Sequence, residues 1–143
     1  MPLTFLCPTD GSKLAQKAVA YAIQRAAKDG ASLTVLHVET LTPERAARTH
    51  FWDQTILDAA DIQDHKILGA AAAAARRAGF RAATYVTVAG RDVAAAIAAF
   101  ARKNRVDHII MGSHGRRGVA QLILGSVANG VAARAGCPVT IVR

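Results

Sequence analysis

Short apolar runs alternate along the chain with longer segments in which apolar residues recur at helical spacing. The runs are rich in aliphatic and β-branched side chains and are bounded by glycine, proline or aspartate turn signals. This pattern predicts five strands, at residues 3–8, 31–38, 81–88, 106–111 and 138–142. Because nearly every position of a run is apolar, we expect strands whose two faces are both covered.

The clearest helical segment covers residues 12–29. Its alanine and aliphatic side chains recur every three or four positions, which predicts one apolar helix face. Asp10 or Ser12 can cap its first turn, because their side-chain oxygens can accept backbone hydrogen bonds there. Gly30 can end it in a left-handed conformation. The segment therefore predicts a helical crossover between the first two strands.

Later segments predict three more helices and one loop. A long helix with an alanine run is expected at residues 56–78, another after a cap at Asp92, and a last one at residues 119–135. Residues 39–55 are polar, contain a proline and lack a clear period, which predicts a loop with room for a short helix. Strands that alternate with helices form parallel βαβ units. We expect one α/β domain over residues 1–143, with helices on both faces of an open sheet.

Composition excludes several classes of protein. Hydrophobic residues make up 52% and charged residues 20% of the chain, which is typical of a packed globular domain rather than a disordered one. No apolar stretch reaches the roughly 18–20 residues that a membrane helix needs, and the first residues lack the features of a signal peptide. We therefore expect no membrane partner and a cytoplasmic location. Cys7 and Cys137 are expected as buried thiols, with a disulfide as the alternative.

The chain is strongly basic, with a formal net charge of +8. This charge favours anionic partners such as nucleotides, nucleic acids or acidic proteins, and it selects none of them. The Lys and Arg residues are spread along the chain and are not interleaved with aromatic residues, as they would be in a single-strand nucleic-acid binder. Solvated helix faces explain them equally well.

Two loops carry the candidate chemistry, because each directly follows a predicted strand. Residues 8–11 follow the first strand and residues 112–115 the fourth. In open α/β sheets, ligands bind beyond the carboxyl ends of the strands. Glycines let backbone N–H groups approach a phosphate, and a helix beginning near Gly118 would add its positive dipole end. The alternative is a plain strand-to-helix turn with glycines for close packing.

One spacing runs through the second loop and beyond it: Gly, two residues, Gly, nine residues, Gly, then Ser. It is met by Gly112, Gly115, Gly125 and Ser126. The chain also carries PTDGS from residue 8, LHV from residue 36 and CPVTIVR at its end. Together these features resemble the ATP-binding subclass of the universal stress protein family. The common P-loop and the dinucleotide-binding glycine fingerprint are absent.

The resemblance implies a Rossmann-like sheet of order 3-2-1-4-5 and a homodimer formed through the last strand. It also implies a set of binding residues for ATP, or for AMP or ADP. At the adenosine end these are Pro8, Thr9, Asp10, Val38, Met111 and Gly112. Among them, the Asp10 carboxylate is expected near adenine or ribose, and the Val38 backbone at the adenine edge.

At the phosphate end, the resemblance implies that Gly115, Gly125, Ser126 and Val127 surround the phosphates. Ala128 stands where the resemblance implies Thr or another small residue, and relative to Thr it lacks a hydroxyl that could contact a phosphate. We expect Mg²⁺ to be held by the phosphates rather than by a protein-built site, because the histidines show no metal-ligand spacing.

No catalytic arrangement emerges from the sequence. Asp10 is the one carboxylate expected near the ligand, and neither a Ser/His/Asp nor a Cys/His set can be assigned. His114, Arg116 and Arg117 lie in the second loop, where an arginine could pair with a phosphate or stay in solvent. We expect a regulatory nucleotide-binding protein in the stress response, with slow hydrolysis or autophosphorylation at most. The alternatives are an interaction module of the same fold without nucleotide, and a basic nucleic-acid binder.

Overall fold

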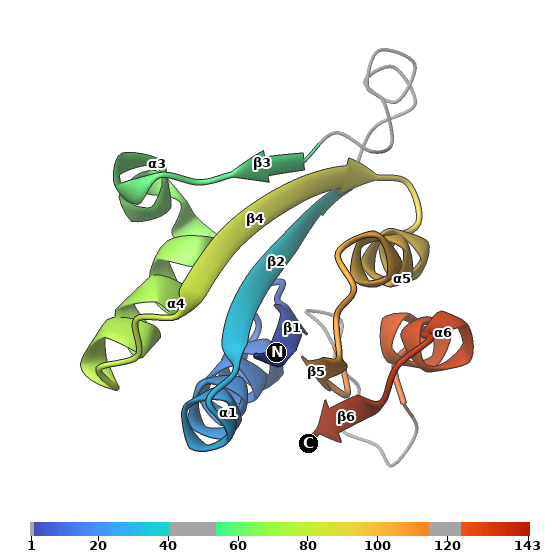
Figure 1. The fold of residues 1–143 in the computed structure, drawn as a ribbon. Coiled ribbons are helices and arrows are strands. Elements are labelled where there is room, and N and C mark those ends of the chain that lie inside the picture. The colour runs from blue at the N-terminus through green and yellow to red at the C-terminus, as the bar shows by residue number, and fades with distance from the viewer. Residues whose placement is uncertain (1, 41–53, 115–123) are drawn as a thin grey trace.

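Six strands form one mixed sheet in the part of the chain that the structure describes, residues 2–40, 54–114 and 124–143 of a computed structural model. Their order across the sheet is β3-β4-β2-β1-β5-β6 (Figure 1). In chain order they are β1 (Thr4–Pro8), β2 (Ser32–Thr40), β3 (Gln54–Ile56), β4 (Ala83–Gly90), β5 (His108–Gly112) and β6 (Val139–Val142). Every neighbouring pair is parallel except β3 and β4, which are antiparallel.

Helices cover both faces of the sheet. The described helices are α1 (Lys13–Asp29), α3 (Ala59–Asp64), α4 (Lys66–Arg77), α5 (Val93–Lys103) and α6 (Ser126–Arg134). Figure 1 shows α1 and α4 on one side of the sheet and α5 and α6 on the other. The core is accordingly split in two, because successive strand residues point to opposite faces. On β1, Phe5 and Cys7 pack under α1, while Leu6 packs on the side of α5 and α6.

The predicted order 3-2-1-4-5 is confirmed, because the five predicted strands are β1, β2, β4, β5 and β6 and lie in the order β4-β2-β1-β5-β6. The sixth strand, β3, was not predicted. Residues 54–56 were expected in a loop and at the start of a helix, but they form β3 at the sheet edge. All three side chains are exposed, and Ile56 has 63% of its surface accessible. A strand of this length with no buried position has no alternation of apolar and polar residues, so no sequence pattern could predict it.

Two helix predictions need correction. The helix expected at residues 56–78 is two helices, because His65 has an extended backbone and its ring caps α4. The helix expected at residues 119–135 begins at Ser126 within the described residues, because Gly125 is extended (φ −65°, ψ 161°). The predicted caps Ser12 and Asp92 are confirmed, as is Gly30, whose φ of 65° is left-handed. Residues 41–53, most of the expected loop, lie outside the described residues.

Both cysteines are free, as expected from the sequence, but they differ in burial. Cys7 is fully buried in the core, and burial raises the pKa of its thiol to about 12. Cys137 is half-buried, and burial also raises the pKa of its thiol. Both thiols are therefore held in the protonated, weakly reactive form at neutral pH.

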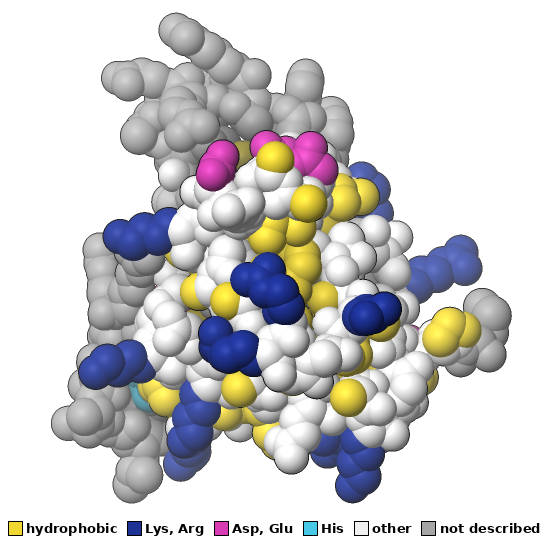
Figure 2. Space-filling view, turned by 90° about the vertical axis from the view of Figure 1, so that its left-hand side faces the viewer, with side chains coloured by type: hydrophobic (Ala, Val, Ile, Leu, Met, Phe, Trp, Pro, Cys, Tyr) yellow, Lys and Arg dark blue, Asp and Glu magenta, His cyan; other side chains and the backbone are white. Residues whose placement is uncertain are grey.

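On the side of the molecule that carries α3 and α4, basic and acidic side chains are distributed differently. Figure 2 shows Lys and Arg side chains spread among apolar and neutral ones on this face, while acidic side chains gather at its upper end. Asp58, Asp61 and Asp64, which are all exposed, belong to α3 and its N-cap. The described residues of this face form no continuous basic stripe of the kind that follows a nucleic-acid backbone. No helix of the described segments combines the length and apolarity of a membrane span.

Candidate functional site

A cavity of about 650 Å³ opens beyond the carboxyl ends of β1, β2 and β5. Its volume lies within the range typical of small-molecule sites. The ends of these three strands supply much of its wall, and α6 closes one side with its first turn. Side chains from α4 and α5 complete it, namely Ile67, Val93 and Ile97. The cavity therefore occupies the place in an open α/β sheet where ligands bind.

Nine of the ten residues that the sequence singles out line this cavity. They are Pro8, Thr9, Asp10, Val38, Met111, Gly112, Gly125, Ser126 and Val127. The tenth, Gly115, lies outside the described residues, as do Arg116 and Arg117. Residues from three separate stretches of the chain thus meet in one place, because β1 has β2 and β5 as its two neighbours.

The turn after β1 is held by a compact set of hydrogen bonds. The Thr9 N–H donates to the Leu36 carbonyl at 2.8 Å, and the buried Thr9 hydroxyl accepts from the Gly11 N–H at 3.2 Å. Asp10 Oδ1 accepts from the Ser12 N–H at 2.9 Å. These bonds fix the Thr9–Asp10 turn against β2 and place the Asp10 carboxylate at the cavity wall.

The connection from β5 to α6 is fixed by backbone bonds on both sides of Ser113. Its N–H donates to the Val142 carbonyl of β6 at 2.9 Å, and its carbonyl accepts from the Gly125 N–H at 2.8 Å. A Cβ atom on Gly125 would lie 3.0 Å from that carbonyl oxygen, and one on Gly112 would lie 3.2 Å from the Leu14 backbone. Both glycines therefore favour close packing, which is the structural role that the sequence left open.

The first turn of α6 points its free end at the cavity. Gly125 is its N-cap and has no side chain, and no hydrogen bond from a described side chain caps the helix. Backbone N–H groups of a first turn have no partner within the helix and carry the positive end of its dipole. Ser126 adds an exposed hydroxyl beside them. This end of the cavity is suited to an anion such as a phosphate.

A second part of the cavity wall, here called the apolar end, is formed by β2, β5 and α5. Leu36 and Val38 of β2 and Met111 of β5 are buried and line it together with Ile97 of α5. Such a wall fits a flat, weakly polar group such as a nucleobase. A helix N-terminus suited to an anion and an apolar wall in the same cavity match the phosphate and the base of a nucleotide.

Several lining residues were not predicted from the sequence. Leu36, Ile67, Val93 and Ile97 belong to apolar patterns, and nothing in such a pattern separates a cavity wall from a packed core. Ser113 and His114 lie in the glycine-rich loop, where the His114 Nδ1 atom is 3.0 Å from the Ser113 hydroxyl. Ala15, Thr40 and His37 complete the set, and the LHV motif could have drawn attention to His37.

Comparisons with known proteins agree along the whole chain. The model of the universal stress protein family matches residues 1–143. The chain is 33% identical over 146 aligned positions to the universal stress protein YxiE of Bacillus subtilis, with 96% of this chain and 97% of that one covered. It is 32% identical over 140 positions to a universal stress protein of Thermus aquaticus, with 98% of each chain covered.

Solved structures show the same fold. A universal stress protein crystallised in complex with cAMP superimposes with a TM-score of 0.71 at 28% identity, covering 99% of this chain and 96% of that one. One from Archaeoglobus fulgidus in complex with dAMP gives a TM-score of 0.66 at 22% identity, covering 100% and 98%. The family model and the relatives agree with the fold, and the chain belongs to the universal stress protein family.

Proposed function

We propose that this chain binds ATP, or the related AMP or ADP, in the cavity and acts as a regulatory nucleotide-binding protein in the stress response. The observation that carries the proposal is the meeting of nine sequence-predicted residues around one cavity with an anion end and an apolar end. The cAMP complex of a relative that is 28% identical supports an adenine nucleotide as the ligand class.

At the apolar end, the proposal places adenine between the aliphatic side chains of β2, β5 and α5. Val38 would meet the edge of the base through its backbone, and Asp10 would accept a hydrogen bond from ribose or adenine. Met111 and Gly112 would lie beside the ribose. A Cβ atom on Gly112 would crowd the backbone of α1, with Leu14 atoms at 3.2 Å, so glycine suits the close packing of β5 against α1 at this point.

At the anion end, the phosphates would lie against Gly125, Ser126 and Val127, with Gly115 expected beside them. The uncapped first turn of α6 fits this group, because its backbone N–H groups can donate to phosphate oxygens. Ala128 is buried in this turn and offers no hydroxyl. Mg²⁺ would be held by the phosphates, since the described residues contain no cluster of three potential metal ligands.

We also propose a homodimer formed through β6 and a cytoplasmic location. β6 is the last strand of the described sheet, and its four side chains are half-buried, which fits an edge that pairs with a second copy. The two free cysteines are consistent with a reducing compartment.

Mass spectrometry of the small molecules released when freshly purified protein is denatured tests the nucleotide proposal. We expect an adenine nucleotide in near-stoichiometric amount, or stoichiometric uptake after addition of ATP. If no nucleotide is released and none is taken up, an interaction module that uses the empty fold becomes the better account. Binding to DNA or RNA that weakens steeply with salt would instead support the nucleic-acid alternative.

A further inference from the structure

Two histidines connect β2 with the start of α4, two elements that both contribute to the cavity wall. His37 of β2 lines the cavity, and its Nδ1 atom lies 3.0 Å from the carbonyl oxygen of Thr9 in the turn after β1. His65 is the N-cap of α4, where its Nδ1 atom accepts the Leu68 N–H at 3.1 Å. The two rings meet edge to face, with centroids 5.6 Å apart and planes at 69°. Such a distance and angle are typical of a favourable aromatic contact.

The hydrogen-bond partners assign different protonation patterns to the two rings. A carbonyl oxygen only accepts, so the Nδ1 atom of His37 carries a proton. A backbone N–H only donates, so the Nδ1 atom of His65 carries none. His65 loses its bond to Leu68 when it is protonated, because both ring nitrogens then carry hydrogens.

The cap at His65 bears directly on the cavity. Ile67 lies two residues after His65, in the first turn of α4, and its side chain lines the cavity. An N-cap fixes the backbone of that first turn, so the position of Ile67 depends on the bond between His65 and Leu68. The Thr9–Asp10 turn depends in the same way on the bond from His37.

The charges around His65 favour its neutral form. Burial lowers the pKa of His65 below its usual value, the neighbouring His37 lowers it further, and Glu39 of β2 raises it. Around the junction that His65 occupies, α3 carries Asp61 and Asp64 and α4 begins at Lys66, and these three side chains are exposed. The folded chain therefore favours the neutral ring of His65, which is the form that caps α4.

We propose that His37 and His65 are positioning residues that hold the two walls of the nucleotide cavity together, and that protonation of His65 weakens ligand binding. The role in ligand binding rests on the proposed function. The contact between the rings and its effect on the Thr9–Asp10 turn are independent of the proposed function. The two parts can therefore be tested separately.

The first test uses the free protein. In a pH titration from about 8 to 5 followed by amide NMR, we expect the Leu68 and Asp10 signals to shift with one common midpoint. In His65→Asn, where asparagine keeps a side-chain acceptor and cannot titrate in this range, that shared transition should disappear. Movement of Leu68 without Asp10, or an unchanged transition in His65→Asn, would overturn the coupling.

The second test measures affinity for cAMP, whose phosphodiester keeps one charge across this pH range. We expect the dissociation constant of the unsubstituted protein to rise about three- to tenfold between pH 8 and pH 5.5, the size of one lost helix cap. His65→Asn keeps a cap acceptor but loses the ring contact with His37, so it should bind cAMP more weakly than the unsubstituted protein at pH 8 and change less than about twofold with pH. His108→Asn, which removes a histidine distant from the cavity lining, should retain the full pH dependence.

The outcomes separate the two proposals. If cAMP binds but its affinity is independent of pH, or if His65→Asn follows the unsubstituted protein, the role of the histidine pair in binding is wrong. If neither cAMP nor ATP binds at pH 8, the proposed function fails, and the amide titration alone decides whether the two walls are coupled through His37 and His65.

Discussion

The carbonyl oxygen of Ser113 both accepts a hydrogen bond from Gly125 and crowds the position that a side chain of residue 125 would take. The Gly125 N–H donates to the Ser113 carbonyl, and an added Cβ would lie 3.0 Å from that oxygen. The φ angle of −65° is open to any residue, so the constraint is steric contact and not backbone conformation. Its place in the glycine spacing was predictable from the sequence. The Ser113 contact that explains it was not, because it joins two segments across the fold.

Gly125→Ala is therefore expected to push α6 away from the end of β5. Overpacking of this kind costs about 1–3 kcal/mol of unfolding free energy, which should lower the melting temperature by several degrees. Gly136→Ala is the matched control, because a Cβ there meets nothing within 4 Å. Equal melting temperatures for the two variants in a thermal denaturation scan would contradict the packing role.

Gly115→Val tests the phosphate cradle that the family resemblance implies. A side chain at this position should keep backbone N–H groups from approaching the phosphates, with little effect on the fold. The expected loss is a few kcal/mol of ATP binding, because hydrogen bonds to charged groups contribute about 1.5–3 kcal/mol each. Calorimetric titration and a thermal melt on one sample separate binding from stability. Unchanged ATP affinity in a folded variant would remove Gly115 from the site.

At the scale of elements, the sequence predicted the strands that are packed on both faces. It did not predict the short strand β3 or the break between α3 and α4. The long apolar runs became β1, β2, β4, β5 and β6 in the expected order. β3 has no buried residue, so it left no pattern. The break between α3 and α4 depends on one imidazole cap at His65, a residue type that does not signal a helix boundary. The apolar residues of the cavity wall could not be told from core residues, because both give the same apolar pattern in the sequence.

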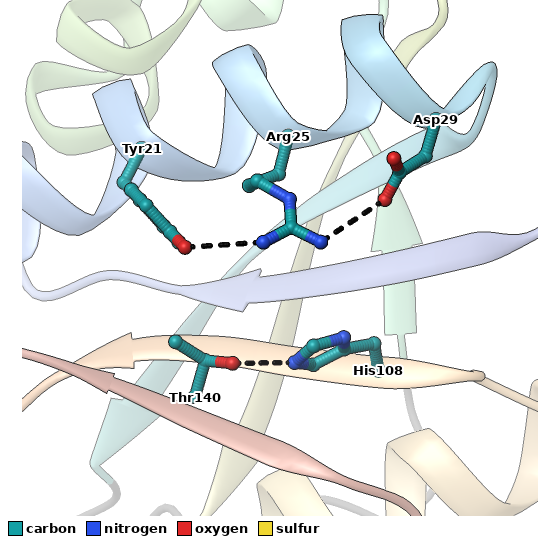
Figure 3. A network of polar contacts seen from close by, with 5 residues as sticks. All are labelled: Tyr21, Arg25, Asp29, His108 and Thr140. Carbon is teal, nitrogen blue, oxygen red and sulfur yellow. Dashed lines mark hydrogen bonds and ion pairs between the residues drawn. The ribbon is translucent and has the colours of Figure 1, made fainter.

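The edge strand β6 is joined to β5 by a side-chain contact that involves a histidine, His108. Figure 3 shows His108 of β5 beside Thr140 of β6, with Tyr21, Arg25 and Asp29 of α1 across from them. The His108 Nε2 atom lies 2.6 Å from the Thr140 hydroxyl oxygen. Burial lowers the pKa of His108, Arg25 lowers it further, and Asp29 raises it. The folded chain therefore favours the neutral ring.

The lowered pKa of His108 predicts a loss of stability in acid. The stabilisation is complete above the pKa of an unfolded histidine, about 6.5, and is lost as the pH falls from there through the lower pKa of the folded state. In His108→Asn, the difference between urea denaturation midpoints at pH 8 and pH 5 should shrink. Thr140→Val keeps the buried ring and should keep most of that difference. An unchanged difference in His108→Asn would show that His108 takes up the same number of protons in the folded and unfolded states, which would contradict a lowered pKa in the folded chain.

At the scale of the whole molecule, the sheet is covered on both faces, and β6 ends the described sheet on one side. β6 contributes Val139 and Ile141 to one core face, where they are only partly buried. A second copy paired along β6 would bury the side chains of this strand that are half-exposed in a single chain. This gain in burial is the physical basis for the proposed dimer.

Ile141→Asp is expected to weaken that dimer, because a charge would stand on the half-exposed face of β6 that the second copy is proposed to cover. Light scattering should give twice the chain mass of 15.0 kDa for the unsubstituted protein at micromolar concentration, and a lower mass for the variant. Ala70→Asp, on the exposed side of α4, serves as the control and should remain dimeric. A monomer mass for the unsubstituted protein would contradict the dimer.

Calorimetric titration of ATP into nucleotide-free protein at about pH 8 is the most direct test of the proposed function. The account predicts saturable binding with one nucleotide per chain, and competition by AMP, ADP and cAMP for the same cavity. Substitution of Asp10 by Asn should weaken this binding without loss of fold, because Asn can still accept the Ser12 N–H but lacks the carboxylate charge. Absence of measurable ATP binding by the folded, unsubstituted protein would contradict the central claim.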